Sequence, residues 1–168
     1  MVEAAILDKN IILIGMPGCG KTTIGSILAK QLKIEFIDMD EYIQNTTSKT
    51  VGELFETGEE YFRDIETKAC IELAKKKNIL ISTGGGVVKR SENIGILKKD
   101  SIIIFIDRPV EKILKDVDVS KRPLLKDGKE KIINLYKERY ELYKKAADKV
   151  VLNDKNINEV IEKLHELL

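Results

Sequence analysis

The feature that most constrains this chain is a glycine-rich segment set between an apolar run and a helical pattern. Residues 15–22 read Gly-Met-Pro-Gly-Cys-Gly-Lys-Thr and match the spacing G-x-x-x-x-G-K-[ST]. The apolar run 11–14 precedes them, and residues 23–32 have a helical pattern. In such a segment the backbone N–H groups surround phosphate oxygens, and the following helix adds its positive end. The sequence therefore predicts a phosphate-binding loop that joins a strand to a helix.

The motif also predicts which groups bind a nucleotide. Lys21 is expected to reach the β and γ phosphates, and the hydroxyl of Thr22 is expected to hold Mg²⁺. The guanine-binding pattern Asn-Lys-x-Asp is missing in its usual form, and residues 153–156 are a poor substitute, so ATP is the expected nucleotide. The predicted contacts in and after the loop are Gly18, Cys19, Gly20, Lys21, Thr22 and Thr23.

Five short apolar runs rich in β-branched residues predict five strands, separated by longer charged segments with helical spacing. This alternation indicates an α/β fold, in which a parallel sheet lies between two layers of helices. Because the chain has 168 residues and no internal repeat or long linker, residues 1–168 are expected to form one domain. The expected strands are 11–14, 34–37, 79–81, 102–106 and 150–152.

Charge and cysteine usage restrict the partners and the compartment. Lys plus Arg number 29 and Asp plus Glu 28, so no overall field draws the chain to nucleic acid or anionic lipid. The sequence contains no run of 18 consecutive apolar residues, so it predicts no membrane span. Two cysteines 51 positions apart fit a reducing compartment better than a disulfide framework. We therefore expect a cytoplasmic monomer that binds neither nucleic acid nor membranes.

Two carboxylates follow the second predicted strand, at the edge of the sheet where parallel α/β folds bind ligands. Alternation along a strand would point Asp38 and Asp40 the same way, beside the phosphate loop. One of them could then orient the water shell of a metal ion, and the other could accept a hydroxyl proton. The alternative is that Asp38 only caps the helix that begins near Glu41.

A triple glycine, Gly84-Gly85-Gly86, follows the third predicted strand. Three residues without side chains allow another group to approach the backbone closely, and their amides can donate to a polar substrate. A flexible loop is the alternative. The position at the carboxyl end of a strand favours a role in binding.

Arginine is rare in this chain, since only five of the 29 basic residues are Arg. Arg139 falls on the apolar stripe of a predicted helix and is expected to face inward, where it needs an internal acid or an anionic ligand. Arg63 lies on another predicted helix, with Glu59 one turn earlier as an alternative partner. Arg122 lies in a weakly periodic segment and is either part of a cationic lid or a solvated charge.

With these motifs assembled, the chain resembles the shikimate kinase family over nearly its whole length. The resemblance implies a P-loop fold with strand order 2-3-1-4-5, substrate-binding helices within about 38–65 and a lid at about 116–128. It also implies transfer of the γ-phosphoryl group of ATP, with Mg²⁺, to the 3-hydroxyl of shikimate in aromatic amino acid biosynthesis. The shared motifs are residues 15–22, Asp38-x-Asp40, Phe62-Arg63 with Ile65-Glu66, Gly84-Gly85-Gly86, Arg122-Pro123-Leu124-Leu125 and Arg139-x-x-x-Tyr143.

The resemblance further implies roles for single residues. Asp40 would bind ring hydroxyls and act as the base, and Asp38 would bind Mg²⁺ through water. The catalytic residues would be Lys21, Asp40 and Arg122, with Arg122 also contacting ATP. The groups on the shikimate carboxylate would be Arg63, Arg139 and the backbone of Gly85, and Gly84 and Gly86 would also bind the substrate.

Three positions on the nucleotide side depart from the family pattern or are only loosely defined by it. Cys19 replaces the usual Ser, and at a helix N-terminus its thiol is expected to be acidic and prone to oxidation. Lys115 occupies a position where the family often has an Arg that packs on adenine. Segment 153–156, which includes Lys155, would flank the base.

Two other functions remain open from the sequence. One is a related kinase of a small metabolite, either gluconate or a nucleoside monophosphate, and the other is a non-catalytic nucleotide-binding regulator. Gluconate kinases tend to carry His soon after the Asp-x-Asp, where this chain has residues 41–43, Glu-Tyr-Ile. A regulator would be expected to have lost one of Lys21, Asp38, Asp40 and Arg122, all of which are present.

Overall fold

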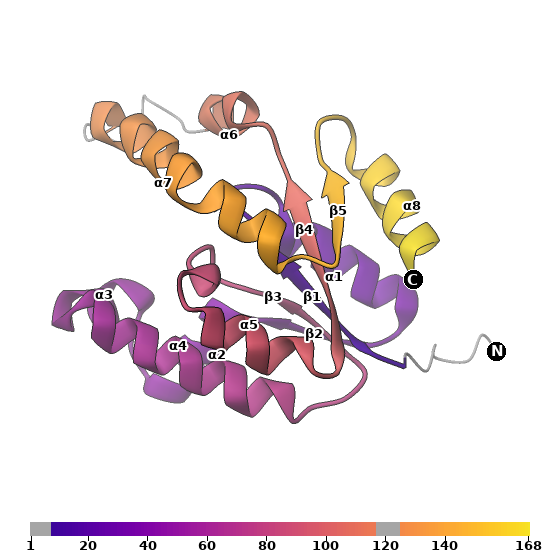
Figure 1. Ribbon diagram of the computed structural model, residues 1–168, viewed down its shortest axis with the longest axis horizontal. Helices are drawn as coiled ribbons and strands as arrows, with labels where there is room; N and C mark the ends of the chain where they lie inside the picture. The colour runs from indigo at the N-terminus through magenta and orange to yellow at the C-terminus, as the bar shows by residue number, and fades with distance from the viewer. Residues whose placement is uncertain (1–7, 117–124) are drawn as a thin grey trace.

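The computed structural model describes residues 8–116 and 125–168 (Figure 1). Its strands form one parallel sheet with the order β2-β3-β1-β4-β5. The strands are β1 (Asn10–Ile14), β2 (Glu35–Asp38), β3 (Ile79–Ser82), β4 (Ser101–Asp107) and β5 (Lys149–Leu152). The helices are α1 (Lys21–Leu32), α2 (Met39–Thr47), α3 (Val51–Thr57), α4 (Glu59–Ala74), the 3-10 helix η1 (Val87–Lys89), α5 (Ser91–Lys98), α6 (Val110–Asp116), α7 (Leu125–Ala146) and α8 (Ile157–Leu167).

Burial on both faces explains why the central strands are apolar along their length. All five residues of β1 and all four of β3 are buried, and β-branched side chains suit such positions. The edge strand β5 has only Val151 buried. The predicted α/β fold, with its parallel sheet and strand order, is therefore confirmed.

Register and alternation show which helices cover which face of the sheet. Leu13 of β1 pairs with Ile104 of β4, and Gly25 of α1 packs closely on the Leu13 side chain. The next residue, Phe105, points to the opposite face and stacks on Tyr143 of α7 with ring centroids 5.1 Å apart. Helix α1, with α8 packed beside it, therefore covers one face, and α7 covers the other (Figure 1).

The last part of the expected lid is helical. Residues 125–128, expected to belong to a lid, are the first turn of this 22-residue helix. The turn is charged, so it carries too little apolar periodicity to be recognised from the sequence. The rest of the expected lid between Asp116 and α7, including Arg122, lies outside the described residues. In the described ranges, no helix is long and apolar enough to cross a bilayer.

Candidate active site

The predicted phosphate loop lies between β1 and α1 at the carboxyl edge of the sheet. Gly18 and Gly20 have positive φ angles of 80° and 101°, a region that favours glycine because it has no Cβ. Gly20 is the N-cap of α1, so the loop leads directly into the positive end of the helix. The loop and the first turn of α1 line one side of a cavity of about 510 Å³, the loop-side cavity.

Lys21 is buried, and its ammonium group faces the loop. Its Nζ donates to the carbonyl oxygens of Gly15 at 2.7 Å and Met16 at 3.0 Å. Both acceptors are neutral, and a buried cation is costly unless an anion balances it. Because Lys21 also lines the loop-side cavity, a phosphate group bound there would supply that balance.

Thr22 and Asp38 form a pair of oxygen donors in the same cavity. The Thr22 hydroxyl donates to Oδ2 of Asp38 at 2.8 Å, and both residues line the loop-side cavity. The other oxygen, Oδ1, accepts the backbone N–H of Glu41 at 3.0 Å and caps α2. The capping role and the cavity role of Asp38 therefore coexist. A hydroxyl beside a carboxylate, next to a phosphate site, fits Mg²⁺, which binds few protein oxygens and several phosphate and water oxygens.

Asp40 lies where the loop-side cavity meets a second one. The sequence argument assumed strand-like alternation from Asp38 to Asp40, which is wrong, because β2 ends at Asp38 and Asp40 belongs to the first turn of α2. The turn nevertheless directs both carboxylates into the loop-side cavity. Burial raises the pKa of the Asp40 carboxyl, and the neighbouring Asp38 raises this pKa further.

The second cavity, of about 500 Å³, lies between α3, α4, η1 and α7 and is called the arginine cavity below. Asp40, Gly84 and Gly85 line both cavities. The two cavities therefore share a wall, and a group bound in one can lie close to a group bound in the other.

The triple glycine provides space for the charged groups of the arginine cavity. A Cβ on Gly84 would lie 3.0 Å from Oδ1 of Asp40, and one on Gly86 would lie 2.6 Å from Cζ of Arg63. A Cβ on Gly85 would meet the Pro17 ring of the phosphate loop at 2.8 Å. The expected close approach to this backbone is confirmed, and the approaching groups are side chains of the site itself.

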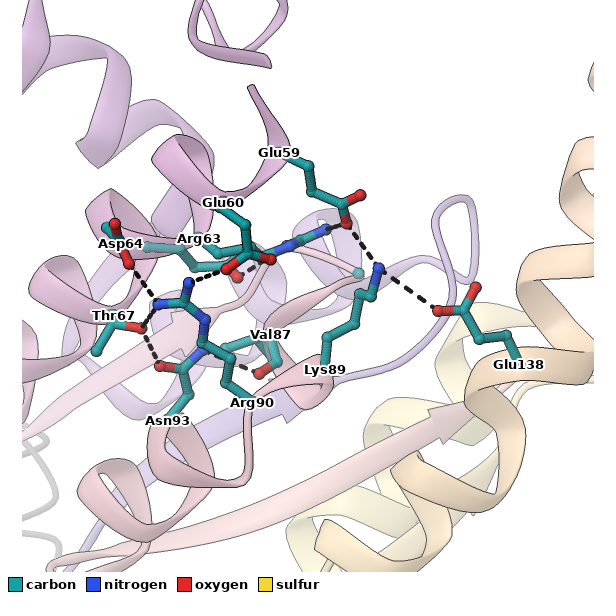
Figure 2. Close-up of polar contacts among 12 residues, drawn as sticks. Glu59, Glu60, Arg63, Asp64, Thr67, Val87, Lys89, Arg90, Asn93 and Glu138 are labelled. Atoms are coloured by element: carbon teal, nitrogen blue, oxygen red, sulfur yellow. Dashed lines mark hydrogen bonds and ion pairs between the residues drawn. The ribbon is translucent and has the colours of Figure 1, made fainter. Parts of the chain in front are cut away.

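Arg63 is buried and held on several sides (Figure 2). Its Nη1 donates to Glu66 at 2.8 Å, and its Nη2 lies 3.5 Å from Glu59, the partner considered from the sequence. The guanidinium lies 5.5 Å and 5.2 Å from the ring centroids of Phe55 and Phe62. Its Nε has no hydrogen-bond partner among the described residues. Internal acids therefore occupy both Nη atoms of this guanidinium and leave its buried Nε without an acceptor in the described part of the chain.

Arg139 faces inward from α7, as its position on the apolar stripe predicted. It is only 7% exposed, and it lines the arginine cavity. Its Nε also has no hydrogen-bond partner in the described part of the chain. One turn later, the Tyr143 hydroxyl donates to the carbonyl oxygen of Gly85 at 2.5 Å, which fixes α7 to the triple glycine. A buried donor without an acceptor is unfavourable, so the site is suited to an anionic ligand.

Three further residues help to build the site: Arg108 and Lys89 had no role from the sequence, and Asn153 was expected only as part of the segment that flanks the base. Arg108, at the end of β4, lines the loop-side cavity, donates to the Gly18 carbonyl at 2.9 Å and pairs with Asp116 at 2.6 Å. Asn153, after β5, donates to the Cys19 carbonyl at 2.8 Å. Lys89 of η1 lines the arginine cavity. Position could have indicated Arg108 and Asn153, because each directly follows a strand.

The structure does not bring every predicted nucleotide contact into the loop-side cavity. Lys115 is exposed on α6, and Lys155 is exposed beside Glu159 at 3.9 Å; neither lines the cavity. Cys19 is fully buried, and its N–H donates to the Met16 carbonyl. This burial contradicts the expected ready oxidation of its thiol, because a reagent needs access to sulfur.

Comparisons with known proteins agree with this arrangement. Residues 17–168 match the family model described as shikimate kinase. A shikimate kinase of Clostridium beijerinckii is 60% identical over 162 residues, which make up 96% of each chain. The structure of shikimate kinase from Acinetobacter baumannii in complex with shikimate has a TM-score of 0.86 and 34% identity, and the match covers 95% of this chain and 92% of that one. The crystal structure of shikimate kinase from Aquifex aeolicus has a TM-score of 0.82 and 39% identity, with 94% of both chains covered.

Proposed function

The chain belongs to the shikimate kinase family, and from this premise we propose how its residues carry out the reaction. It is an ATP-dependent kinase that phosphorylates an alcohol group, and its reaction converts shikimate and ATP into shikimate 3-phosphate and ADP. The observation that carries the residue assignment is the wall shared by the two cavities, with Lys21 on one side and two arginines on the other.

In this proposal the loop-side cavity binds ATP. The backbone of the loop surrounds the phosphates, and Lys21 exchanges its neutral carbonyl partners for phosphate oxygens. Thr22 and Asp38 would hold Mg²⁺, Asp38 through water. When bound there, the ion would supply positive charge to the phosphate oxygens. Thr23 and Arg108 line the same cavity and complete the nucleotide contacts.

The arginine cavity binds shikimate in the same proposal. Arg63 and Arg139 hold the carboxylate, and the backbone of Gly84–Gly86 adds further contacts. The support for this is that both guanidinium groups line the cavity or its wall and that the Nε of each has no partner among the described residues. Asp40 then faces the 3-hydroxyl from the shared wall. Its raised pKa suits a carboxylate that accepts a proton late in the transfer. Since phosphoryl transfer depends mostly on positioning and charge, Asp40 acts chiefly by aligning the hydroxyl.

The test is ADP release with shikimate, gluconate and AMP supplied in parallel, each with and without a chelator of Mg²⁺. Of the three acceptors, we expect only shikimate to support ADP release, and we expect the chelator to abolish it. The Lys21→Ala variant should release almost no ADP with any acceptor. Turnover with gluconate or AMP would indicate another small-metabolite kinase, and turnover with none of the three would indicate a nucleotide-binding regulator.

We also propose that the protein is a cytoplasmic, single-domain monomer. Its two cysteines are both buried and unpaired, which fits a reducing compartment, and the net charge of +1 gives no general attraction for polyanions. Sedimentation at several protein concentrations tests the monomer.

A further inference from the structure

One carboxylate oxygen at the arginine cavity interacts with two cations. Oε1 of Glu59 lies 2.6 Å from Nζ of Lys89 and 3.5 Å from Nη2 of Arg63 (Figure 2). Glu59 and Arg63 are one turn apart on α4, whereas Lys89 comes from η1. All three line the arginine cavity. The two cations therefore compete for one acceptor, and Lys89 has the shorter contact.

Ion pairs hold both Lys89 and the residue that follows it. The next residue, Arg90, forms ion pairs of 2.8 Å with Glu60 and of 2.8 Å with Asp64 on α4. Nζ of Lys89 also lies 3.5 Å from Glu138 of α7. Figure 2 shows two sets of polar contacts, one around Lys89 and one around Arg90, which together join the end of η1 to α4 and, through Lys89, to α7.

Lys89 affects which donors of Arg63 a ligand can use. Nη1 of Arg63 is taken by Glu66, which is as buried as Arg63 itself. The other donors are Nε, which is buried and has no partner in the described ranges, and Nη2, whose hydrogen bond to Glu59 is long at 3.5 Å. These two donors point in parallel and can bind both oxygens of one carboxylate. The hydrogen bond from Lys89 is also the main cause of the lowered pKa of Glu59, so Glu59 is charged at neutral pH.

We propose that Lys89 is a positioning residue for the acceptor: it holds Glu59 and thereby keeps Nη2 of Arg63 available for the carboxylate of shikimate. Without Lys89, the Glu59 carboxylate is free to close onto the guanidinium from the same helix face and to compete with the substrate. This inference rests on the proposed function, because it takes Arg63 as a ligand of the substrate carboxylate.

The test is a double-mutant cycle on the whole chain, with shikimate binding measured by calorimetry. Lys89→Met keeps the length of the side chain and removes the charge, and it should weaken shikimate binding by about fivefold, a typical coupling within a charge network. Adding Glu59→Gln should restore affinity to within about twofold of the wild-type value, because the competing charge is gone. Adding Glu138→Gln instead should leave the affinity as weak as in Lys89→Met alone.

Three controls separate this role from a general structural one. ATP affinity should be unchanged in every variant, and Lys89→Arg should bind shikimate as the wild type does. Lys75→Met is the matched control, since it removes a lysine that pairs with Glu72 at 3.0 Å beyond the other end of α4; its shikimate affinity should equal that of the wild type.

Two results would overturn the inference: unchanged shikimate affinity in Lys89→Met, or a double variant Lys89→Met/Glu59→Gln that binds as weakly as Lys89→Met. The second result would mean that Lys89 contacts the substrate directly. If the wild-type chain itself bound no shikimate, the proposed function would fail instead, so the two failures are distinguishable.

Discussion

Replacing Gly86 with Ala tests whether the arginine cavity is built around the guanidinium of Arg63. Gly86 has φ −95° and ψ 5°, a negative φ that alanine also adopts, so the backbone allows the change. The added Cβ, however, would lie 2.6 Å from Cζ of Arg63. Carbon atoms in contact are normally at least about 3.5 Å apart. The guanidinium must therefore move by about 1 Å.

The surroundings of Arg63 turn this movement into a loss of binding. Phe55 and Phe62 pack against the guanidinium, and Glu66 holds Nη1 at 2.8 Å, so the space open to it is the arginine cavity that shikimate must occupy. A displacement of about 1 Å in a positioning group costs on the order of 100-fold, or about 2.7 kcal/mol. We expect the KM for shikimate to rise by about that factor and the KM for ATP to stay within about twofold.

The assay is ADP release with each substrate varied in turn. Gly95→Ala is the matched control, because a Cβ at this position of α5 meets nothing within 4 Å; its kinetics should equal those of the wild type. A folded Gly86→Ala variant with an unchanged KM for shikimate would refute the placement of Arg63 in the binding site.

The remaining predictions concern one residue each. Arg139→Lys should raise the KM for shikimate by at least about tenfold and barely change the KM for ATP, because an ammonium cannot supply two parallel donors; equal effects on both KM values would argue against a contact with the carboxylate. Arg108→Ala should raise the KM for ATP by about tenfold through loss of its contact with the Gly18 carbonyl, and a change confined to the KM for shikimate would contradict this. The pKa of the Asp40 carboxyl is higher in the folded chain than in the unfolded chain, so the ionised carboxylate destabilises the fold. This destabilisation is absent at a pH below the unfolded-state pKa and is complete at a pH above the raised folded-state pKa. Asp40→Asn should therefore raise the Tm at neutral pH by about 2 °C while kcat falls, and calorimetry showing a lower Tm would disprove this sign. In the wild type, kcat should fall as the pH drops through the raised pKa of Asp40.

The sequence predicted the strands well because burial on both faces leaves a strong apolar signal. The expected run 11–14 differs from β1 by one residue, and the run 102–106 lies within β4. Apolar runs alone do not say which strands are neighbours, so the strand order came from the family resemblance. Helix α7 shows the limit of periodicity, since its charged first turn resembles a loop.

The site residues that sequence reasoning missed act through contacts between distant parts of the chain. Arg108 reaches a carbonyl 90 positions away, and Lys89 reaches Glu59 across 30 positions. No local pattern encodes either contact, and one lysine in a lysine-rich chain does not stand out. Glycine and arginine gave better signals: the triple glycine predicted a close approach, and the inward position of Arg139 follows from the apolar stripe of α7.

The wall formed by Asp40, Gly84 and Gly85 has a consequence for inhibitor chemistry. Because the two cavities meet there, a short bridge between a cyclic carboxylic acid and a polyphosphate would let one compound fill both. Once one end is seated, the other end is present at a local concentration of order millimolar. Such a bisubstrate compound would gain avidity from a few bridging atoms, and an enzyme whose two cavities did not adjoin would offer it no such gain.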